Sequence, residues 1–386
     1  MADRHAWIEE GAHRVAPGVH RIPLPLPSDA LRAVNVYAIE AAGGLVLIDS
    51  GWALANARDQ LERSLATIGA GLPDVRQFLV THLHRDHYTQ AVEIRRLFGT
   101  PVAIGAEEKH SIDRLLSSRF RPLGAQLTML TAAGAAVVAD QLAALTVMDV
   151  VGSGDGGEGI GPAQVPGAEL GAPGHPNLLP GATFAAALGY EAPDEWIAAG
   201  QEFDLGTRTL TAIHTPGHTR GHLVFADAAA GLLFAGDHVL PHITPSIGFE
   251  ESPSEMPLRD YLQSLNVVRA LPDMQLLPAH GPVSPSTHVR VDELAEHHAR
   301  RLQAMCDVLS GGELTGYEVA LAIPWTSRQR KLADFDLMNQ MLAIGETMYH
   351  LDLLVARSLA VSRTEVGGVR RYRLASPATD DDGAAS

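Results

Sequence analysis

Hydrophobic positions in the first third of the chain follow two alternating periods, which predict strands and helices in turn. Val34–Glu40 and Leu45–Asp49 are apolar, β-branched runs separated by two glycines, a pattern typical of a hairpin. Apolar residues then recur at helical spacing over Ala53–Ile68, and Gln77–Thr81 is a short apolar strand. The chain therefore begins as an alternation of strands and helices.

The alternation returns after residue 200 and gives the chain two similar halves. A strand pattern covers Glu202–His214. The other elements expected in the two halves are helices at Thr89–Phe98 and Leu258–Ala270 and strands at Pro101–Gly105, Leu223–Ala226, Leu232–Ala235 and Gln275–Pro278. Strands separated by helices in two halves predict an α/β protein built as an αββα sandwich, in which two sheets face each other and helices lie outside.

Residues from about 106 to 195 do not follow this alternation. Glu107–Ser118 has a helical pattern, but Gly152–Gly161 and Pro162–Pro180 are rich in glycine and proline, which prevent long regular elements. We interpret the segment as an insertion of helices and a mobile loop lying over the functional site. A disordered spacer without a role is the alternative, since loops of this length are usually either functional or disordered.

The pattern becomes mostly helical from residue 287 onward. The expected elements are helices at Thr287–Leu309, Thr315–Ile323, Asp336–Ala343 and Glu346–Leu359, then strands at Leu359–Val366 and Val369–Leu374. Helices followed by a hairpin fit a small winged-helix-like domain over residues 287–375. Residues 1–286 would then form the main domain with its insertion, and the acidic tail at 376–386 is expected to be disordered.

Composition narrows the classes of function. The formal net charge of −16 disfavours a general nucleic-acid binder, which needs a basic surface to neutralise phosphates. The one cysteine, Cys306, excludes an intramolecular disulfide. The polar N-terminus lacks the apolar region of a secretory signal, and no apolar run reaches the ~18 residues of a membrane span. We therefore expect a cytoplasmic protein with no membrane partner.

Four candidate metal ligands lie close together in the motif His82-x-His84-x-Asp86-His87. Histidine and carboxylate side chains are the ligands that divalent cations such as zinc prefer. Because residues i and i+2 at the end of a strand point to the same side, His82 and His84 can chelate one ion. The chain must then turn for Asp86 and His87 to reach a second ion.

This motif resembles the signature of hydrolases with the metallo-β-lactamase fold. The remaining parts of that pattern occur in the expected order: Asp49 in Leu47-Ile-Asp-Ser-Gly51, His218 in His214-Thr-Pro-Gly-His-Thr219, Asp237 in Ala235-Gly-Asp-His238 and His280 in Pro278-Ala-His-Gly281. The resemblance covers roughly residues 15–285 and points to the branch with glyoxalase II-like and ribonuclease-like members. The C-terminal part resembles the winged-helix appendage of some of those members.

The resemblance assigns roles to these residues. It implies that one ion is held by His82, His84 and His218, that a second is held by Asp86, His87 and His280, and that Asp237 bridges both. Two divalent ions follow, with zinc favoured and iron or manganese as alternatives, because this ligand set suits all three. The implied mechanism is attack by a hydroxide that bridges the ions, with Asp86 and Asp237 as catalytic residues. Asp49 would support a ligand, and His238 is a candidate proton donor by adjacency alone.

The substrate class rests on the same resemblance. The segment Thr215-Pro-Gly-His-Thr-Arg-Gly-His222 resembles that of hydroxyacylglutathione hydrolase, so we favour a small-molecule acyl substrate, either a thioester or a carboxylic ester. A phosphodiesterase or ribonuclease acting on nucleic acid is the first alternative, and a lactonase is the second. A mononuclear iron dioxygenase needs only three protein ligands, and the intact second ligand set argues against it. A homodimer is expected only by analogy.

Overall fold

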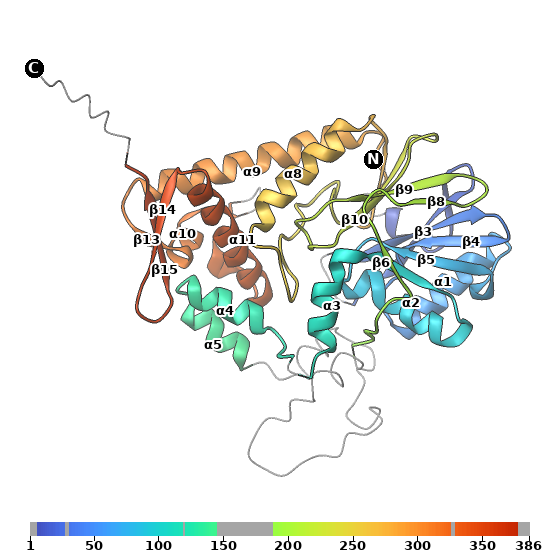
Figure 1. Cartoon of the computed structure of the whole chain (residues 1–386), viewed down its shortest axis with the longest axis horizontal. Coiled ribbons are helices and arrows are strands. Elements are labelled where there is room, and N and C mark those ends of the chain that lie inside the picture. Colours follow the sequence, from blue (N-terminus) through green and yellow to red (C-terminus); the bar gives the residue numbers. More distant parts are fainter. Residues whose placement is uncertain (1–5, 28–30, 119, 145–187, 326–328, 377–386) are drawn as a thin grey trace, which may run out of the picture. The chain divides into compact units, whose positions relative to one another are not determined.

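The computed structural model describes residues 6–27, 31–118, 120–144, 188–325 and 329–376 (Figure 1). Two compact units appear among these residues. The first unit comprises the described parts of 1–125 and 144–295, and the second comprises 126–143 and the described parts of 296–386.

The first unit contains a seven-stranded sheet whose spatial order follows the chain. Its strands are β1 (His13–Ala16), β2 (Val19–Pro25), β3 (Ala33–Ala41), β4 (Gly44–Ile48), β5 (Val75–Val80), β6 (Val102–Gly105) and β7 (Glu195–Ile197). β3 and β4 pair antiparallel, which confirms the predicted hairpin. β4 to β7 are parallel to one another, because helical segments cross over between several of them.

A five-stranded sheet forms the other half of this unit. In spatial order its strands are β12 (Gln275–Pro278), β11 (Leu232–Gly236), β10 (Leu223–Asp227), β9 (Thr209–His214) and β8 (Glu202–Asp204). β11 and β12 are parallel, and the other neighbours are antiparallel. All of these strands lie where the sequence predicted strand patterns.

The two sheets face each other across a shared apolar core. Ile39 and Ile48 from the first sheet belong to the same buried cluster as Phe225 and Phe234 from the second. The α1 helix (Ala55–Ala66) and the α2 helix (Arg85–Phe98) bury their apolar sides in a second cluster with residues of the first sheet. Figure 1 shows both helices on the outer face of that sheet. This arrangement confirms the expected αββα sandwich.

The order of the strands brings several chain segments to one edge of the sandwich. β4 and β5 are parallel neighbours, and so are β11 and β12. Because the carboxyl ends of parallel strands meet at one edge, the residues that follow these four strands are brought near one another. The α8 helix (Pro257–Ala270) connects β11 to β12 along the chain.

The segment at 106–195 divides between the two units. A short 3₁₀ turn, η3 (Ala106–Glu108), and α3 (Lys109–Leu116) belong to the first unit, as a helix was predicted there. Most of α4 (Gly124–Ala132) and all of α5 (Ala136–Ala143) group with the C-terminal residues, which the sequence did not indicate. The predicted loop at 152–180 lies outside the described residues.

The second unit combines helices with a small sheet. Its elements are the C-terminal part of α9 (Thr287–Leu309), β13 (Leu314–Thr315), α10 (Gly316–Ala322), η5 (Leu332–Asp334), α11 (Leu337–Ala356), β14 (Ala360–Thr364) and β15 (Arg370–Leu374). The sheet has the order β13-β15-β14, and the hairpin of β14 and β15 was expected. A winged-helix identity, and the domain limits at 286 and 375, stay predictions.

One helix of this unit is longer than predicted. Two helices were expected over Asp336–Ala343 and Glu346–Leu359, but α11 runs through both without a break. Gly345 is buried inside the helix, and a Cβ at that position would lie 3.2 Å from the Met129 side chain. The glycine therefore permits close packing rather than ending the helix. None of the helices in the described residues is both long and apolar enough to cross a membrane.

A buried histidine pair in the second unit leads to a pH-dependent prediction. His298 Nδ1 lies 3.1 Å from His350 Nε2, and His350 Nδ1 donates to the Glu346 carbonyl oxygen at 2.7 Å. Burial lowers the pKa of both rings to about 3. The unfolded chain binds protons below its ordinary histidine pKa of about 6.5, whereas the folded chain does not, so stability falls as the pH falls from about 6.5 towards 3.

We expect this loss to be visible in urea unfolding at pH 7 and pH 5. The free energy of unfolding should be about 2 kcal/mol lower per histidine at pH 5 than at pH 7. His298→Gln keeps a hydrogen-bond donor but removes one titrating ring, so the variant should lose about that much less stability than the wild type between the two pH values. An equal loss in both proteins would contradict the assignment.

Candidate metal centre

Every ligand candidate from the sequence lies at the same edge of the sandwich, just beyond the end of a strand. The His82–His87 motif follows β5, and His218 lies in the loop between β9 and β10. Asp237 directly follows β11, and His280 lies two residues after β12. Residues in loops at a sheet edge take no part in the pairing of strands, so their polar side chains can converge on a shared site.

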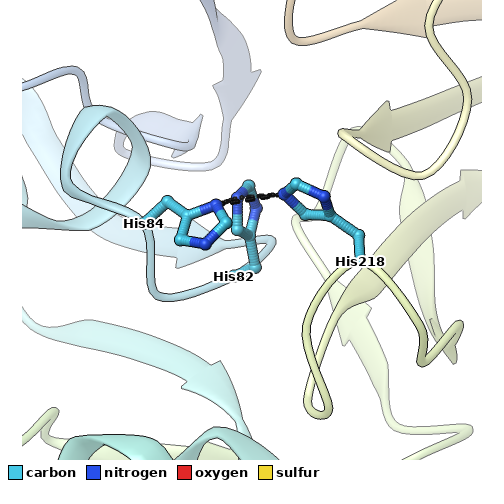
Figure 2. A group of neighbouring side chains, drawn as sticks. All are labelled: His82, His84 and His218. Atoms are coloured by element: carbon cyan, nitrogen blue, oxygen red, sulfur yellow. Dashed lines mark hydrogen bonds between the residues drawn. The ribbon is translucent and has the colours of Figure 1, made fainter. Parts of the chain in front are cut away.

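Three of these histidines form one group (Figure 2). His82 Nε2 lies 3.0 Å from His84 Nδ1 and 3.2 Å from His218 Nε2, and the last two nitrogens lie 3.0 Å apart. Donor atoms about 2.0–2.1 Å from one tetrahedral ion lie roughly 3.3–3.4 Å apart. The triangle is therefore close to the size that a single ion requires.

The outward-facing nitrogens of these rings have other partners. His84 Nε2 donates to the Phe249 carbonyl oxygen at 2.7 Å, and His218 Nδ1 donates to the Ser246 carbonyl oxygen at 2.6 Å. Carbonyl oxygens accept only, so these contacts fix the proton on the outer nitrogen of each ring. The inner nitrogens then carry lone pairs that repel one another unless a cation lies among them.

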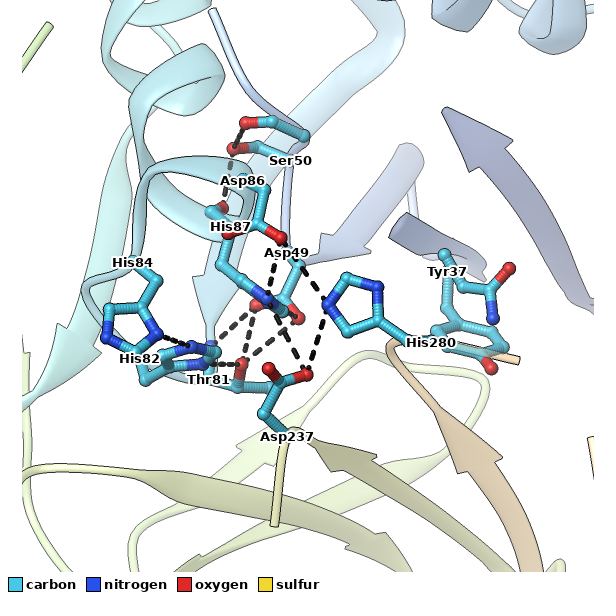
Figure 3. A network of polar contacts seen from close by, with 12 residues as sticks. Tyr37, Asp49, Ser50, Thr81, His82, His84, Asp86, His87, Asp237 and His280 are labelled. Carbon is cyan, nitrogen blue, oxygen red and sulfur yellow. Dashed lines mark hydrogen bonds and ion pairs between the residues drawn. The ribbon is translucent and has the colours of Figure 1, made fainter. Parts of the chain in front are cut away.

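Asp86, His87 and His280 form a second group (Figure 3). Asp86 Oδ2 lies 3.4 Å from His280 Nε2 and 3.6 Å from His87 Nε2. Asp237 lies between the two groups. Its Oδ2 is 3.5 Å from His218 Nε2, while its Oδ1 is 3.3 Å from His280 Nε2. One carboxylate therefore presents an oxygen to each group, as a bridging ligand does.

Three inner atoms, two of the second group and one of Asp237, lack hydrogen-bond partners within the described residues. They are His87 Nε2, His280 Nε2 and Asp237 Oδ1, and all three are buried. Buried polar atoms are nearly always hydrogen-bonded, so three orphans facing one another need an explanation. Shared coordination of a divalent cation by nitrogen and oxygen donors satisfies all of them. The residues present fit two ions.

The electrostatics of the two groups differ. Burial and the nearby His84 ring lower the pKa of His218 to about 3, so this ring is neutral and can act as a ligand. Burial also opposes charge on His87, but three carboxylates, with that of Asp86 first, raise the pKa of His87 to about 10. The second group therefore attracts positive charge, which suits a cation site.

Asp86 and His87 lie in the first turn of α2, which corrects the expectation of a turn followed by a helix at Thr89. The helix begins at Arg85, immediately after His84. Polar ligands occupy its first turn, so the apolar periodicity that marks the helix in sequence begins four residues later. Ser50 fixes this turn, because its amide and hydroxyl both donate to the His87 carbonyl oxygen, at 3.0 and 2.7 Å.

Asp49 contacts one candidate ligand directly and a second through Thr81, which fits the role expected from the sequence. Its Oδ2 accepts from His87 Nδ1 at 2.9 Å, which leaves Nε2 of that ring for the site. Its Oδ1 accepts from the Thr81 amide at 2.8 Å. The Thr81 hydroxyl lies 2.9 Å from the same oxygen and 3.0 Å from His82 Nδ1. One carboxylate thus orients a histidine of each group.

Asp49→Ala should weaken metal binding about 10–100-fold, the usual cost of losing a partner that orients a ligand. Asp49 has a φ of 61°, in the left-handed region that asparagine also tolerates. Asp49→Asn keeps the backbone conformation and one of the two acceptor oxygens, so it should lose less affinity than the alanine variant. Competition with a chromogenic chelator measures both affinities, and an unchanged affinity in the alanine variant would refute the role.

The loop that carries His280 is held by residues that the sequence analysis did not identify. Asn35 Nδ2 donates to the carbonyl oxygens of Pro278 and Gly281, at 3.0 and 2.8 Å. Tyr37 also donates to Pro278, at 2.8 Å. His280 Nδ1 donates to the Ala33 carbonyl oxygen at 2.8 Å. β3 of the first half therefore positions a ligand from the second half.

Two other histidines near the site differ from expectation. His222 had no assigned role, yet its Nε2 accepts from the Asp237 amide at 3.1 Å, so it positions the bridging residue. The repeated histidines of the 214–222 segment were its only signal in the sequence. His238, the candidate proton donor, is fully buried and packs edge-on against Tyr261 at 5.1 Å. That burial argues against proton donation to a substrate.

Comparisons with known proteins agree with this geometry. Residues 29–280 match the profile described as the metallo-beta-lactamase superfamily. A beta-lactamase-like protein 2 homolog of Caenorhabditis elegans is 31% identical over 152 residues, which is 38% of this chain and 49% of that protein. An atrochrysone carboxyl ACP thioesterase of Paecilomyces divaricatus is 33% identical over 110 residues, 28% of this chain and 32% of that protein. The chain spans about half or less of the length of these relatives.

Solved structures are similar over most of the chain. A metallo-beta-lactamase family protein from Thermus thermophilus has a TM-score of 0.68 at 23% identity, covering 94% of this chain and 100% of that protein. A beta-lactamase domain protein from Burkholderia ambifaria has a TM-score of 0.67 at 23% identity, covering 94% and 93%. At this identity the likeness concerns the fold.

Proposed function

This chain belongs to the metallo-β-lactamase superfamily, and on that premise we propose that it is a hydrolase that uses two divalent metal ions to cleave a thioester or carboxylic ester. Zinc is the ion we expect first, with iron or manganese as alternatives, since nitrogen and carboxylate ligands suit all three. His82, His84 and His218 would hold one ion. Asp86, His87 and His280 would hold the other.

The position of Asp237 carries this proposal. Its two carboxylate oxygens lie 3.3 Å from His280 Nε2 and 3.5 Å from His218 Nε2, so one side chain serves both groups. A single-ion site would need only one of the two groups. When bound, two such ions lower the pKa of a water molecule towards ~7 and stabilise negative charge on oxygen.

Asp86 is the carboxylate best placed to act on that water. Its side chain is 17% exposed, against 9% for Asp237, so it is the more accessible of the two carboxylates. The Asp86 carboxylate can accept a hydrogen bond from the attacking water, which directs a lone pair of the water oxygen towards a carbonyl carbon. Asp237 has both oxygens directed at the histidines, so its proposed role is to bridge the two ions.

A thioester is the substrate class that this site favours. A thiolate leaves readily, because the pKa of an ordinary thiol is about 8.5, whereas an alkoxide needs a proton donor. The donor that the sequence suggested, His238, is packed against Tyr261. The similarity of part of this chain to an atrochrysone carboxyl ACP thioesterase of Paecilomyces divaricatus supports the same class.

A nucleic-acid substrate has less support. Arg363, Arg370, Arg371 and Arg373 of the C-terminal hairpin would be its phosphate contacts. Arg373 donates to the Leu374 carbonyl oxygen. The other three form ion pairs within the second unit: Arg363 with Glu313 and Glu365, Arg370 with Asp352, and Arg371 with Glu318 and Glu365. Such pairs offset the positive charge that phosphate binding would use, and the chain as a whole carries a net charge of −16.

The test is thiol release from a panel of acyl thioesters by the metal-replete protein, run beside carboxylic esters, lactones and a phosphodiester. We expect thioester turnover that a chelator abolishes and zinc restores. No turnover of any thioester or ester, in protein shown to contain two ions, would refute the proposed substrate class. Turnover of the lactones or the phosphodiester alone would instead put one of those alternatives first.

A further inference from the structure

A buried carboxyl group outside the proposed ligand set lies beside the loops that carry the histidines of the first group. Glu108 ends the η3 turn between β6 and α3, and it is fully buried. Burial and the nearby Glu250 raise its pKa well above the ordinary value. Two buried acids close together are costly to desolvate, so an apolar residue of similar volume would be expected there unless the acids serve a purpose.

The turn that carries Glu108 packs directly against the loop that carries His218. A Cβ at Gly221 would overlap the Glu108 amide nitrogen. A Cβ at Gly105 would overlap the Gly221 carbonyl oxygen in the same way. Only glycine permits backbones to approach this closely, so both positions fix Glu108 against the loop.

Glu108 contacts both loops of the first group. The Thr219 hydroxyl donates to Glu108 Oε1 at 2.5 Å, and Thr219 directly follows His218 and is fully buried. The backbone amide of Leu83, the residue between His82 and His84, is close enough to the same carboxyl group to oppose the rise in its pKa. The Glu108 side chain therefore lies between the loop after β5 and the loop after β9.

Glu250 makes a parallel set of contacts on the neighbouring segment. Its Oε1 accepts from the Arg220 amide and its Oε2 from the Ser111 hydroxyl, at 2.5 and 2.6 Å. The preceding residue, Phe249, is the one whose carbonyl oxygen accepts from His84 Nε2. The two acids thus secure the loops from different elements.

We propose that Glu108 is a positioning residue for the ion held by His82, His84 and His218. Its carboxyl group acts through Thr219 and Leu83 to fix the separation of the two loops on which these ligands lie. The inference rests on the proposed metal site but on no particular substrate. A purely structural role predicts something different. In that case an apolar side chain filling the same space would leave the stability of the protein unchanged or raise it.

The test compares Glu108→Leu with Glu108→Gln in the full chain, with zinc affinity measured by chelator competition and stability by thermal unfolding. We expect the leucine variant to bind zinc about 10–100-fold more weakly, as when other partners of metal ligands are removed. The glutamine variant keeps an acceptor oxygen for Thr219 and should restore affinity to within a few-fold. Thr219→Val should match the leucine variant, and the double variant should lose no more than either one.

Asp227→Leu is the matched control. Asp227 is a buried acid of the same unit, and its carboxylate pairs with Arg208 at 2.8 Å rather than with the ligand loops. The control should lower stability and leave zinc affinity unchanged. Wild-type affinity in Glu108→Leu, or in Thr219→Val if the leucine variant does not fold, would overturn the inference. A wild type that binds no zinc would instead defeat the proposed function on which the inference rests.

Discussion

Asp237→Ala should lower the rate of thioester hydrolysis by more than about 100-fold. Partners that merely orient metal ligands cost about 10–100-fold when removed, and Asp237 would contact both ions directly. The substitution removes the oxygen that lies 3.3 Å from His280 Nε2 and also the oxygen that lies 3.5 Å from His218 Nε2. Both groups should therefore bind metal more weakly, and the loss should appear mainly in kcat.

Asp227→Ala provides the control for this experiment. Asp227 ends β10, as Asp237 follows β11, and its carboxylate is also enclosed, but its partners are Arg208 and the Ala230 amide. This variant should unfold at a lower temperature and keep its activity and bound metal. If the Asp237 variant kept more than about a tenth of the wild-type rate with its metal content intact, its bridging role would be wrong.

Removal of metal should have the second large effect, on stability as well as on activity. The inner nitrogens of His82, His84 and His218 lie 3.0–3.2 Å apart with their lone pairs facing one another. A bound cation turns this repulsion into coordination, so binding favours the folded state. Free zinc at about 1,000 times its dissociation constant should stabilise the fold by about 4 kcal/mol per site.

Urea unfolding of chelator-treated protein, repeated at increasing free zinc, measures this effect. The midpoint should rise with zinc concentration, and activity should return over the same range. Magnesium is the control cation, because it prefers oxygen ligands and waters to imidazole. A midpoint that does not depend on zinc would show that the two groups do not bind the ion in the folded state.

The grouping of the candidate ligands could be predicted because they are concentrated in short motifs. His82, His84, Asp86 and His87 lie within one short stretch of chain, so the spacing itself indicates the chemistry. Each remaining ligand follows a strand pattern, and strand order then brings them together. The fold was predictable for the same reason, since apolar periodicity marks most strands and helices directly.

Contacts between distant segments could not be read in this way. Asn35 holds the 278–281 loop from a strand more than 240 residues earlier. No motif around Asn35 in the sequence indicates this role. Glu108 and Thr219 meet across 111 positions. The sequence predicts the start of α2 too late, because candidate ligands interrupt its apolar pattern. It also predicts two helices in place of α11, because Gly345, which serves close packing, resembles a helix end.

The most direct test of the account is the number of metal ions bound by the wild-type chain, measured by elemental analysis after dialysis against low free zinc. Two ions per chain are predicted, one for the group of His82, His84 and His218 and one for the group of Asp86, His87 and His280. One ion per chain in fully active protein would contradict the binuclear centre.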